Sequence, residues 1–307
     1  MKKSRLTVPP DSGEPPKGFH ISEAFGSRAE YDEFEHHSLV EDDVKVASAR
    51  RSFDAQVPRS GGLRMMMVLM EHPFFALAPR ATPIDYRSRD GSVLVQVEPG
   101  PQGMATIHDA DVVMFLIETL AASGLGSDRE VTFRPGDYLR AVGAATSGSQ
   151  YESLANAIAR LLTTKVTTNV QSDGKPGPAV SFTWLEAAGR LGRNWHVTLP
   201  AWIVEGSRSS ALLKIPTSYF ELRGMNRGVY LVARKHLGHQ ARWDVRTSTL
   251  WAKLGSSDTL AHFRHMLRKL AAADQMPDFH LKFEEGPDGL LIVTPRVVNH
   301  QPVGIVI

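Results

Sequence analysis

Basic and imidazole side chains recur between residues 258 and 272 at the spacing of one helix face. At about 100° per residue, the apolar side chains fall on one side: Leu260, Phe263, Met266, Leu267 and Leu270. The opposite side carries small and basic residues: Ala261, His262, His265, Arg268, Lys269 and Ala272, with Arg264 on the flank. Arginine can donate two hydrogen bonds to guanine, and a small alanine allows close approach to the bases. The pattern favours a helix that enters the major groove of DNA over a basic helix that is only solvated.

Polar and basic residues upstream of this helix suit contacts to phosphate. One residue of Ser256–Thr259 is expected to cap the helix, and the hydroxyls of Ser257 and Thr259 are candidate phosphate ligands. Further candidates are the cations Arg234, Lys235, Arg242 and Arg246. Such contacts position a protein on DNA without reading its sequence, and some of these cations would instead pair with carboxylates.

The segments around this helix follow the order of elements in a winged helix. A helix over 227–237, a short helix over 247–254 and a turn over 255–257 precede it. Two β-rich segments, 280–283 and 290–294, follow and flank a turn-rich loop. The loop carries three carboxylates, Glu284, Glu285 and Asp288. Their charge disfavours a wing that lies deep in a minor groove.

An earlier part of the chain repeats this order. A helix over 108–124, a strand over 130–133, a short helix over 136–142 and a longer helix over 149–163 precede a hairpin with the loop 173–177. The outward side of the longer helix carries Ser149, Glu152, Ser153, Asn156 and Arg160. Asn156 and Arg160 could read adenine and guanine, whereas Glu152 would oppose phosphates. DNA contact and a protein interface therefore both fit this copy.

The sequence predicts an α+β protein with tandem winged-helix domains. We expect a disordered N-terminal tail over 1–62, an N-terminal winged-helix domain over 63–222 and a C-terminal one over 223–297. The tail is rich in proline, serine, glycine and charge, which favours disorder. Residues 65–77 and 92–97 are predicted strands at the start of the first domain.

Charge is distributed unevenly along the chain. The formal net charge is only +2 over 307 residues, but residues 225–275 hold nine lysines or arginines against three aspartates. A compact basic segment of this kind is typical of phosphate binding. The C-terminal domain is therefore the expected main DNA reader.

Several other classes of function lack their residues. Cysteine is absent, which excludes disulfides and thiol catalysis and fits a reducing, cytoplasmic location. No apolar run is long enough for a membrane span, and no GxxxxGK[ST] motif appears. His36-His37 and the pair His262 and His265 lack the spacing of a nicking nuclease's metal site. We expect no enzyme activity, no catalytic residue, no cofactor and no metal.

Short stretches spread over about 63–295 resemble the replication initiator protein A family of plasmids. They are Met70–Leu77 (MEHPFFAL), Pro83–Tyr86 (PIDY), Ala105–Asp111 (ATIHDAD), Leu199–Trp202 (LPAW) and Leu231–Gly238 (LVARKHLG). The stretches are specific as a set, although none is a catalytic signature.

The resemblance implies a non-enzymatic initiator. Such proteins bind repeated double-stranded sites at a plasmid origin, help to open the adjoining AT-rich duplex, and bring in the host initiator and helicase. The resemblance also implies that the N-terminal domain serves dimerisation and secondary DNA contacts, so a homodimer is expected. A winged-helix transcriptional repressor without a replication role is the alternative, since it would share the fold and the DNA binding.

Overall fold

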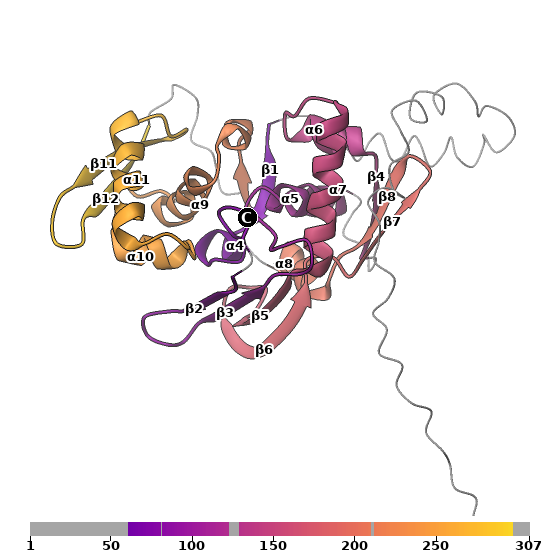
Figure 1. Ribbon diagram of the computed structural model, residues 1–307, viewed down its shortest axis with the longest axis horizontal. Coiled ribbons are helices and arrows are strands. Elements are labelled where there is room, and N and C mark those ends of the chain that lie inside the picture. The colour runs from indigo at the N-terminus through magenta and orange to yellow at the C-terminus, as the bar shows by residue number, and fades with distance from the viewer. Residues whose placement is uncertain (1–60, 81, 123–128, 210–211, 297–307) are drawn as a thin grey trace, which may run out of the picture. The chain divides into compact units, whose positions relative to one another are not determined.

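The computed structural model describes residues 61–80, 82–122, 129–209 and 212–296 (Figure 1). Almost all of the predicted tail, 1–62, lies outside these residues. Helices and strands are mixed along the described chain, which confirms the α+β prediction. Among the described residues, no helix has the length and apolar character needed to cross a bilayer.

The C-terminal copy has the predicted order of elements with one addition. Its elements are α9 (Met225–Leu237), β10 (Trp243–Arg246), α10 (Thr247–Lys253), α11 (Leu260–Ala273), β11 (Phe279–Glu284) and β12 (Leu290–Pro295). The strands form an antiparallel sheet in the order β10-β12-β11 beside the helices (Figure 1). The strand β10 was not predicted, because a segment of only four residues gives a weak strand signal. It extends the wing by pairing with β12.

The N-terminal copy also keeps the predicted order, but its strands join other sheets. Its elements are α5 (Ala110–Ala122), β4 (Glu130–Phe133), α6 (Pro135–Ala141), α7 (Gly148–Thr163), β5 (Lys165–Val170) and β6 (Pro176–Thr183). The hairpin β5–β6 continues a sheet with β2 (Ile84–Arg87) and β3 (Leu94–Glu98), in the order β2-β3-β5-β6. The strand β4 pairs instead with β8 (Asn194–Thr198), which pairs with β7 (Ala187–Leu191).

The predicted strand over 65–77 is wrong. Only β1 (Leu63–Met66) is a strand there, paired with β9 (Leu212–Ile215), and the helix α4 (Met67–Glu71) follows it directly. Val68, Leu69 and Met70 are buried on α4, which packs against α9. Tertiary packing thus overrides an apolar run with strand character. The sequence also gave no sign of α8 (Ala201–Ser209) or the 3₁₀ helix η1 (Thr217–Glu221).

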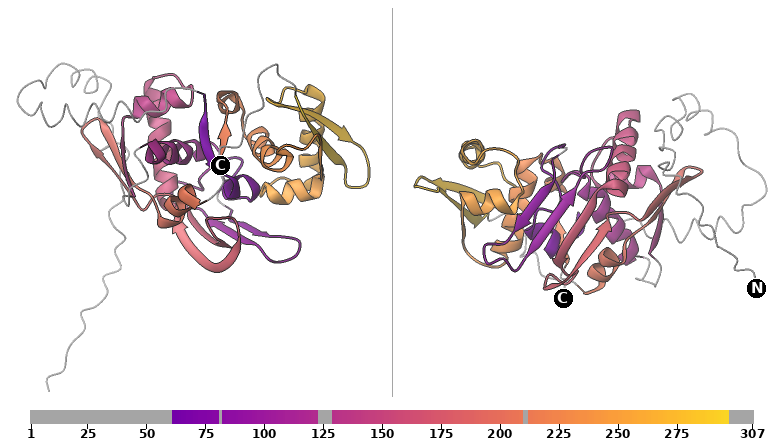
Figure 2. Two further views of the ribbon diagram at one scale, coloured as in Figure 1. Left: turned by 180° about the vertical axis from the view of Figure 1, so that it is seen from behind. Right: turned by 60° about the horizontal axis from the view of Figure 1, so that its bottom comes forward.

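The core of the larger part of the chain is built around α5 and the aromatic residues of the 70–77 stretch. Residues 110–117 of α5 are all buried. Phe74 and Phe75 pack against the fully buried ring of Trp184, with ring centroids 6.1 and 4.2 Å apart. The right-hand panel of Figure 2 shows the sheet β2-β3-β5-β6 with its broad face toward the viewer. The resemblance motif around Phe74 is therefore a packing motif.

Candidate nucleic-acid interface

The helix α11 is docked on its unit by a narrow apolar stripe. Phe263, Leu267 and Leu270 are buried, whereas Leu260 and Met266 from the predicted apolar side are partly exposed. Thr259 caps the helix, since its hydroxyl oxygen accepts a hydrogen bond from the backbone N–H of His262 at 3.2 Å. The opposite face is open to solvent and carries the predicted residues His262, His265, Arg268 and Lys269, with Ser257 exposed in the turn before the helix.

The two arginines of α11 are held by a carboxylate of the wing. Glu285 accepts hydrogen bonds from Arg268 Nε and Nη2 at 2.6 and 3.1 Å, and from Arg264 Nη2 at 2.9 Å. Arg264 also donates to the carbonyl oxygens of Pro287 and Gly286. Both guanidinium groups lie over the ring of Phe283, within 6 Å of its centroid. These contacts tie the wing loop to α11 and fix the direction of both arginines.

The other acidic residues of the wing are engaged in the same way. Asp288 accepts a hydrogen bond from the backbone N–H of Ser248 at 3.0 Å and another from its hydroxyl. It therefore holds the first turn of α10, where a negative charge is favourable. Glu284 pairs with Lys282 at 3.0 Å. The carboxylates that would oppose phosphates thus have cationic or N–H partners within their own unit.

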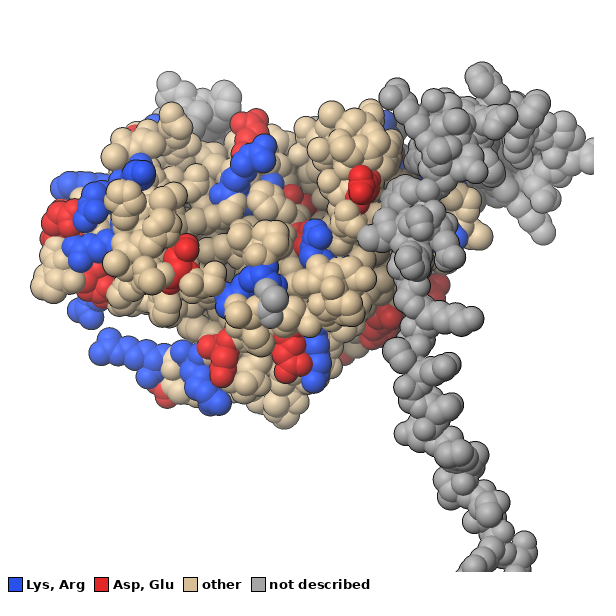
Figure 3. Space-filling view, in the orientation of Figure 1, with Lys and Arg blue, Asp and Glu red and all other residues tan. Residues whose placement is uncertain are grey.

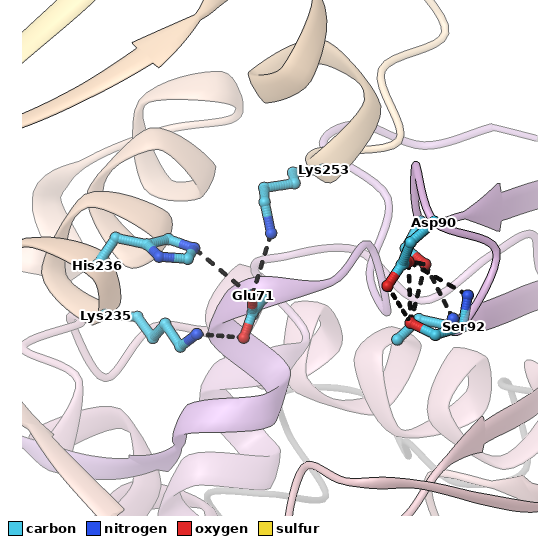
Figure 4. Close-up of polar contacts among 8 residues, drawn as sticks. Glu71, Asp90, Ser92, Lys235, His236 and Lys253 are labelled. Atoms are coloured by element: carbon cyan, nitrogen blue, oxygen red, sulfur yellow. Dashed lines mark hydrogen bonds and ion pairs between the residues drawn. The ribbon is translucent and has the colours of Figure 1, made fainter.

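The cation Lys235 points into the protein. Its ammonium group binds Glu71 at the end of α4, and Lys253 of α10 binds the same carboxylate at 3.2 Å. Figure 4 shows both lysines and His236 converging on Glu71. Burial raises the pKa of Glu71, but the hydrogen bond from Lys235 and the nearby positive charges outweigh it and lower the pKa to about 2. The carboxylate is therefore ionised at neutral pH and joins α4 to α9 and α10.

Two histidines beside this group are neutral at physiological pH. Burial lowers the pKa of His72 and of His236 to about 4, and the neighbouring lysines act in the same direction. The ring of His236 stacks on Trp243 at 5.0 Å. The neighbourhood of Glu71 is thus a structural junction, and Lys235 could reach a phosphate only by leaving it.

The remaining predicted phosphate contacts lie in different surroundings. Arg246 is exposed at the end of β10, and Arg234 is half-buried on α9. Arg242 is exposed and pairs with Asp244 through two hydrogen bonds of 2.7 and 2.8 Å. Arg246, next to α10, differs from Arg242 in having no ion-pair partner among the described residues.

The predicted residues of the N-terminal copy are not brought together into a basic face. Arg160 donates two hydrogen bonds to Asp109, at 2.8 and 2.7 Å, and so joins α7 to the start of α5. Asp109 is buried and also accepts a hydrogen bond from the N–H of Thr106. Asn156 is partly exposed on α7, and Glu152 is exposed beside it.

Sequence reasoning missed the acidic partners that orient these cations. Glu71 lies 164 residues from Lys235, and Asp109 lies 51 residues from Arg160. No local spacing rule relates such pairs. A charged residue inside an apolar stretch, such as Glu71 within Met70–Leu77, was the one signal available. Among the described residues, no group of three or more potential metal ligands occurs.

Comparisons with known proteins identify the family. Residues 65–281 match the family described as "Replication initiator protein A", and the chain therefore belongs to that family. It is 28% identical over 258 residues to a protein of Wigglesworthia glossinidia brevipalpis named "Putative replication protein", over 80% of this chain and 88% of that relative. Family membership assigns the protein to the initiation of replication.

Solved structures show the same fold. One crystal structure of RctB domains 2–3 covers 72% of this chain and 95% of its own, with a TM-score of 0.50 and 15% identity. A second, of a selenomethionine derivative of the same two domains, covers 75% and 98%, with a TM-score of 0.55 and 14% identity. At such low identity the likeness concerns the fold alone. It confirms the fold class that the order of elements predicts.

Proposed function

We propose that this protein initiates plasmid replication by binding repeated double-stranded sites at the origin, with α11 as the reading element. The exposed face of α11 is the observation that carries the proposal. It presents His262, His265 and Lys269 on a helix whose opposite side is docked by buried Phe263 and Leu267. Such a helix can enter a major groove without reorganisation of its unit.

Arg268 is the proposed base reader, oriented by the wing. Its Nε and Nη2 are bound to Glu285, and Nη1 has no hydrogen-bond partner among the described residues. Because Glu285 already restricts the rotamers of this side chain, Arg268 would lose little conformational freedom when the other edge of its guanidinium group binds an acceptor on a base. Ser257 and Arg246 are proposed to contact the phosphates beside the groove, because both are exposed next to the ends of α10 and α11.

The rest of the proposal rests on membership of the family. We propose that bound protein promotes opening of the adjoining duplex and brings in the host initiator and helicase, and that it acts without an enzymatic step. The N-terminal copy is the proposed dimer interface, since its longer helix lacks a basic outward face. Both copies would then contribute to the origin complex in different ways.

The first test is footprinting and binding on the DNA that flanks the gene. Arg268→Ala is expected to relax preference at one base position by about 1–3 kcal/mol, while Lys269→Ala weakens binding to the site. Lys175→Ala, a change of an exposed lysine in the β5–β6 loop, is the matched control and should leave binding unchanged. Unaltered binding by both α11 variants would show that this helix does not read DNA.

A transformation assay separates replication from repression. A plasmid that carries the footprinted repeats should be maintained only when the intact protein is supplied. If the repeats are bound but the plasmid is never maintained, the protein acts as a transcriptional repressor and the replication part of the proposal is wrong.

A further inference from the structure

The hairpin β2–β3 is anchored against the turn between α10 and α11. Gly255 in that turn lies so close to the hairpin that an added Cβ would be 3.3 Å from Ile84 Cγ2, and it would be 2.8 Å from the Cβ of Pro73 in the segment after α4. Arg80 Nη1 donates a hydrogen bond to the carbonyl oxygen of Gly255 at 2.9 Å. Ile84 is the first residue of β2, so the base of the hairpin is packed on the helix-turn-helix itself.

A second contact lies two residues further along β2. Tyr86 of β2 is buried, and its ring lies 5.8 Å from the ring of His72. Burial and the negative charges of Glu71 and Asp90 raise the pKa of Tyr86. Figure 4 shows both Asp90 and Glu71, and Glu71 holds Lys253 of α10. The hairpin thus contacts the turn between α10 and α11 directly at its base. Its Tyr86 packs on His72, the neighbour of the Glu71 that binds Lys253 of α10.

The tip of the hairpin is ordered by Asp90. Its carboxylate accepts hydrogen bonds from the hydroxyls of Ser88 and Ser92, at 2.5 and 2.8 Å, and from the N–H of Ser92 at 3.2 Å. The positive φ of 75° at Gly91 completes the turn. This arrangement leaves the tip with a defined shape.

Two arginines project from this ordered tip. Arg87 and Arg89 are exposed, and neither has an ion-pair or hydrogen-bond partner among the described residues. In Figure 1 the loops of β2–β3 and β11–β12 extend toward the same side, below and above α10, and the right-hand panel of Figure 2 agrees. Figure 3 shows Lys and Arg atoms on this side, both over the α10–α11 unit and over the hairpin below it.

We propose that the β2–β3 hairpin is a second wing, which contacts the sugar–phosphate backbone of the duplex beside the segment read by α11. The inference rests on the proposed function of α11. Arginine guanidinium groups suit phosphate oxygens, and a rigid anchor on the helix-turn-helix fixes where they meet the backbone. The hairpin carries two exposed carboxylates, Asp85 nearer its base and Asp90 at its tip. The contact is assigned to the tip, because two arginines outnumber one carboxylate there and that carboxylate is bound by the hydroxyls of Ser88 and Ser92. The hairpin would position the protein and extend its footprint without reading bases.

The test compares the double variant Arg87→Ala/Arg89→Ala with Lys175→Ala/Arg193→Ala on one footprinted duplex over a range of salt concentrations. Arg193 is exposed in the β7–β8 loop, so the control removes the same charge from two other hairpins. Loss of two phosphate contacts is expected to make the slope of log K against log salt shallower by about 1.8. We expect about a tenfold loss of affinity at low salt, a footprint shortened at one flank, and unchanged base preference. Arg87→Lys/Arg89→Lys should restore most of the slope, because it keeps both charges.

The possible results distinguish the two proposals. If the hairpin variant matches its control while Arg268→Ala and Lys269→Ala still impair binding, the hairpin proposal is wrong and the function proposed for α11 stands. If neither the hairpin nor the α11 variants alter binding, both proposals are wrong. A changed base preference in the hairpin variant would also overturn the inference, since a backbone contact carries no sequence information. Thermal unfolding of each variant shows whether a loss of binding reflects a loss of fold.

Discussion

The longer helices of the two copies, α7 and α11, carry one and two arginines respectively, Arg160 on α7 and Arg264 and Arg268 on α11. Each arginine meets a carboxylate, but the carboxylates differ in burial. The side chain of Asp109, which binds Arg160 of α7, is 3% exposed, whereas that of Glu285, which binds Arg264 and Arg268 of α11, is 61% exposed. Breaking the first pair leaves a charge inside the protein, and breaking the second leaves it in water. An arginine can exchange its carboxylate for a phosphate only in the second situation. The helical spacing of residues in the sequence does not distinguish the two kinds of arginine. The burial of the carboxylate partner does.

The sheets of the two copies also differ, in whether the hairpin of the copy pairs with strands from outside that copy. In the C-terminal copy, β10 joins the wing in the small sheet β10-β12-β11, which contains elements of that copy only. In the N-terminal copy, the hairpin β5–β6 is built into a sheet with β2 and β3, and β4 belongs to another sheet. The N-terminal hairpin is therefore part of a scaffold. The strand pair that this scaffold extends toward the C-terminal copy is β2–β3.

The first helices of the two copies, α5 and α9, are joined by a buried ion pair. Arg227 of α9 binds both carboxylate oxygens of Asp111 on α5 at 2.6 Å and donates to the carbonyl oxygens of Leu222 and Phe220. Burial acts to lower the pKa of Arg227, but the charge of Asp111, its hydrogen bond and the nearby phenols of Tyr219 and Tyr138 together outweigh burial and leave the pKa raised. Both side chains are more than nine-tenths buried. The two copies are therefore joined by a buried polar contact.

Removal of this contact is the largest change that we expect. Asp111→Ala leaves the charge of Arg227 buried without an anionic partner, which costs about 3–5 kcal/mol of unfolding free energy. Chemical denaturation followed by tryptophan fluorescence reports on both copies, since Trp195 and Trp243 lie in different ones. We expect one transition at a lower denaturant concentration, and Asp85→Ala, a change of an exposed aspartate on β2, should leave it in place.

Two separate transitions in Asp111→Ala, with only one of them moved, would contradict the shared core. In that case the copies would be independent folding units, and the ion pair would stabilise only one of them. The two copies would then be two domains, each with its own free energy of unfolding.

The pair Arg160–Asp109 gives an intermediate effect that tests the comparison directly. Arg160→Ala leaves the buried carboxylate of Asp109 with the N–H of Thr106 as its remaining donor, and we expect a loss of about 2–3 kcal/mol in unfolding free energy. Base preference in a binding assay should not change. Lys269→Ala should show the reverse, with stability kept within about 0.5 kcal/mol and binding impaired.

If Arg160→Ala instead changes base preference and keeps its stability, then α7 reads DNA, as its outward side suggests from sequence. The burial of Asp109 would then be a poor guide to function. That result would remove the distinction between α7 and α11.

Local signals explain which elements the sequence predicted well. Pro135 at the first position of α6 and the apolar periodicity of α5, α7 and α11 placed these helices to within two residues. The helix α4 and the strand β10 were missed because each depends on an element that is distant in sequence. The helix α4 packs against α9, and β10 pairs with β12. The secondary-structure propensity of four or five residues does not reveal such long-range packing.

The site was predictable in its position and not in its contacts. Basic charge and helical spacing located α11 and its exposed residues His265 and Lys269. They could not show that Lys235 is bound by Glu71 or that Glu285 holds Arg268, because charge patterns give no pairing between separate elements. Arg87 and Arg89 were overlooked because they lie outside the basic segment, and only the fold brings their hairpin beside the helix-turn-helix.

The smallest effect that we expect concerns the wing carboxylate. Glu285→Gln weakens the hold on Arg264 and Arg268 and removes a negative charge from the side proposed to face DNA, so affinity for any duplex should rise about threefold. The slope of log K against log salt should steepen by up to about 0.9, because one more arginine becomes available to a phosphate. Preference for the footprinted site over random DNA should fall, since Arg268 loses the partner that orients it. Glu130→Gln, which removes an exposed carboxylate from β4, controls for the change in overall charge. If Glu285→Gln leaves the specificity ratio unchanged, Glu285 only neutralises the arginines, and the orientation of Arg268 comes from the ring of Phe283 beneath it.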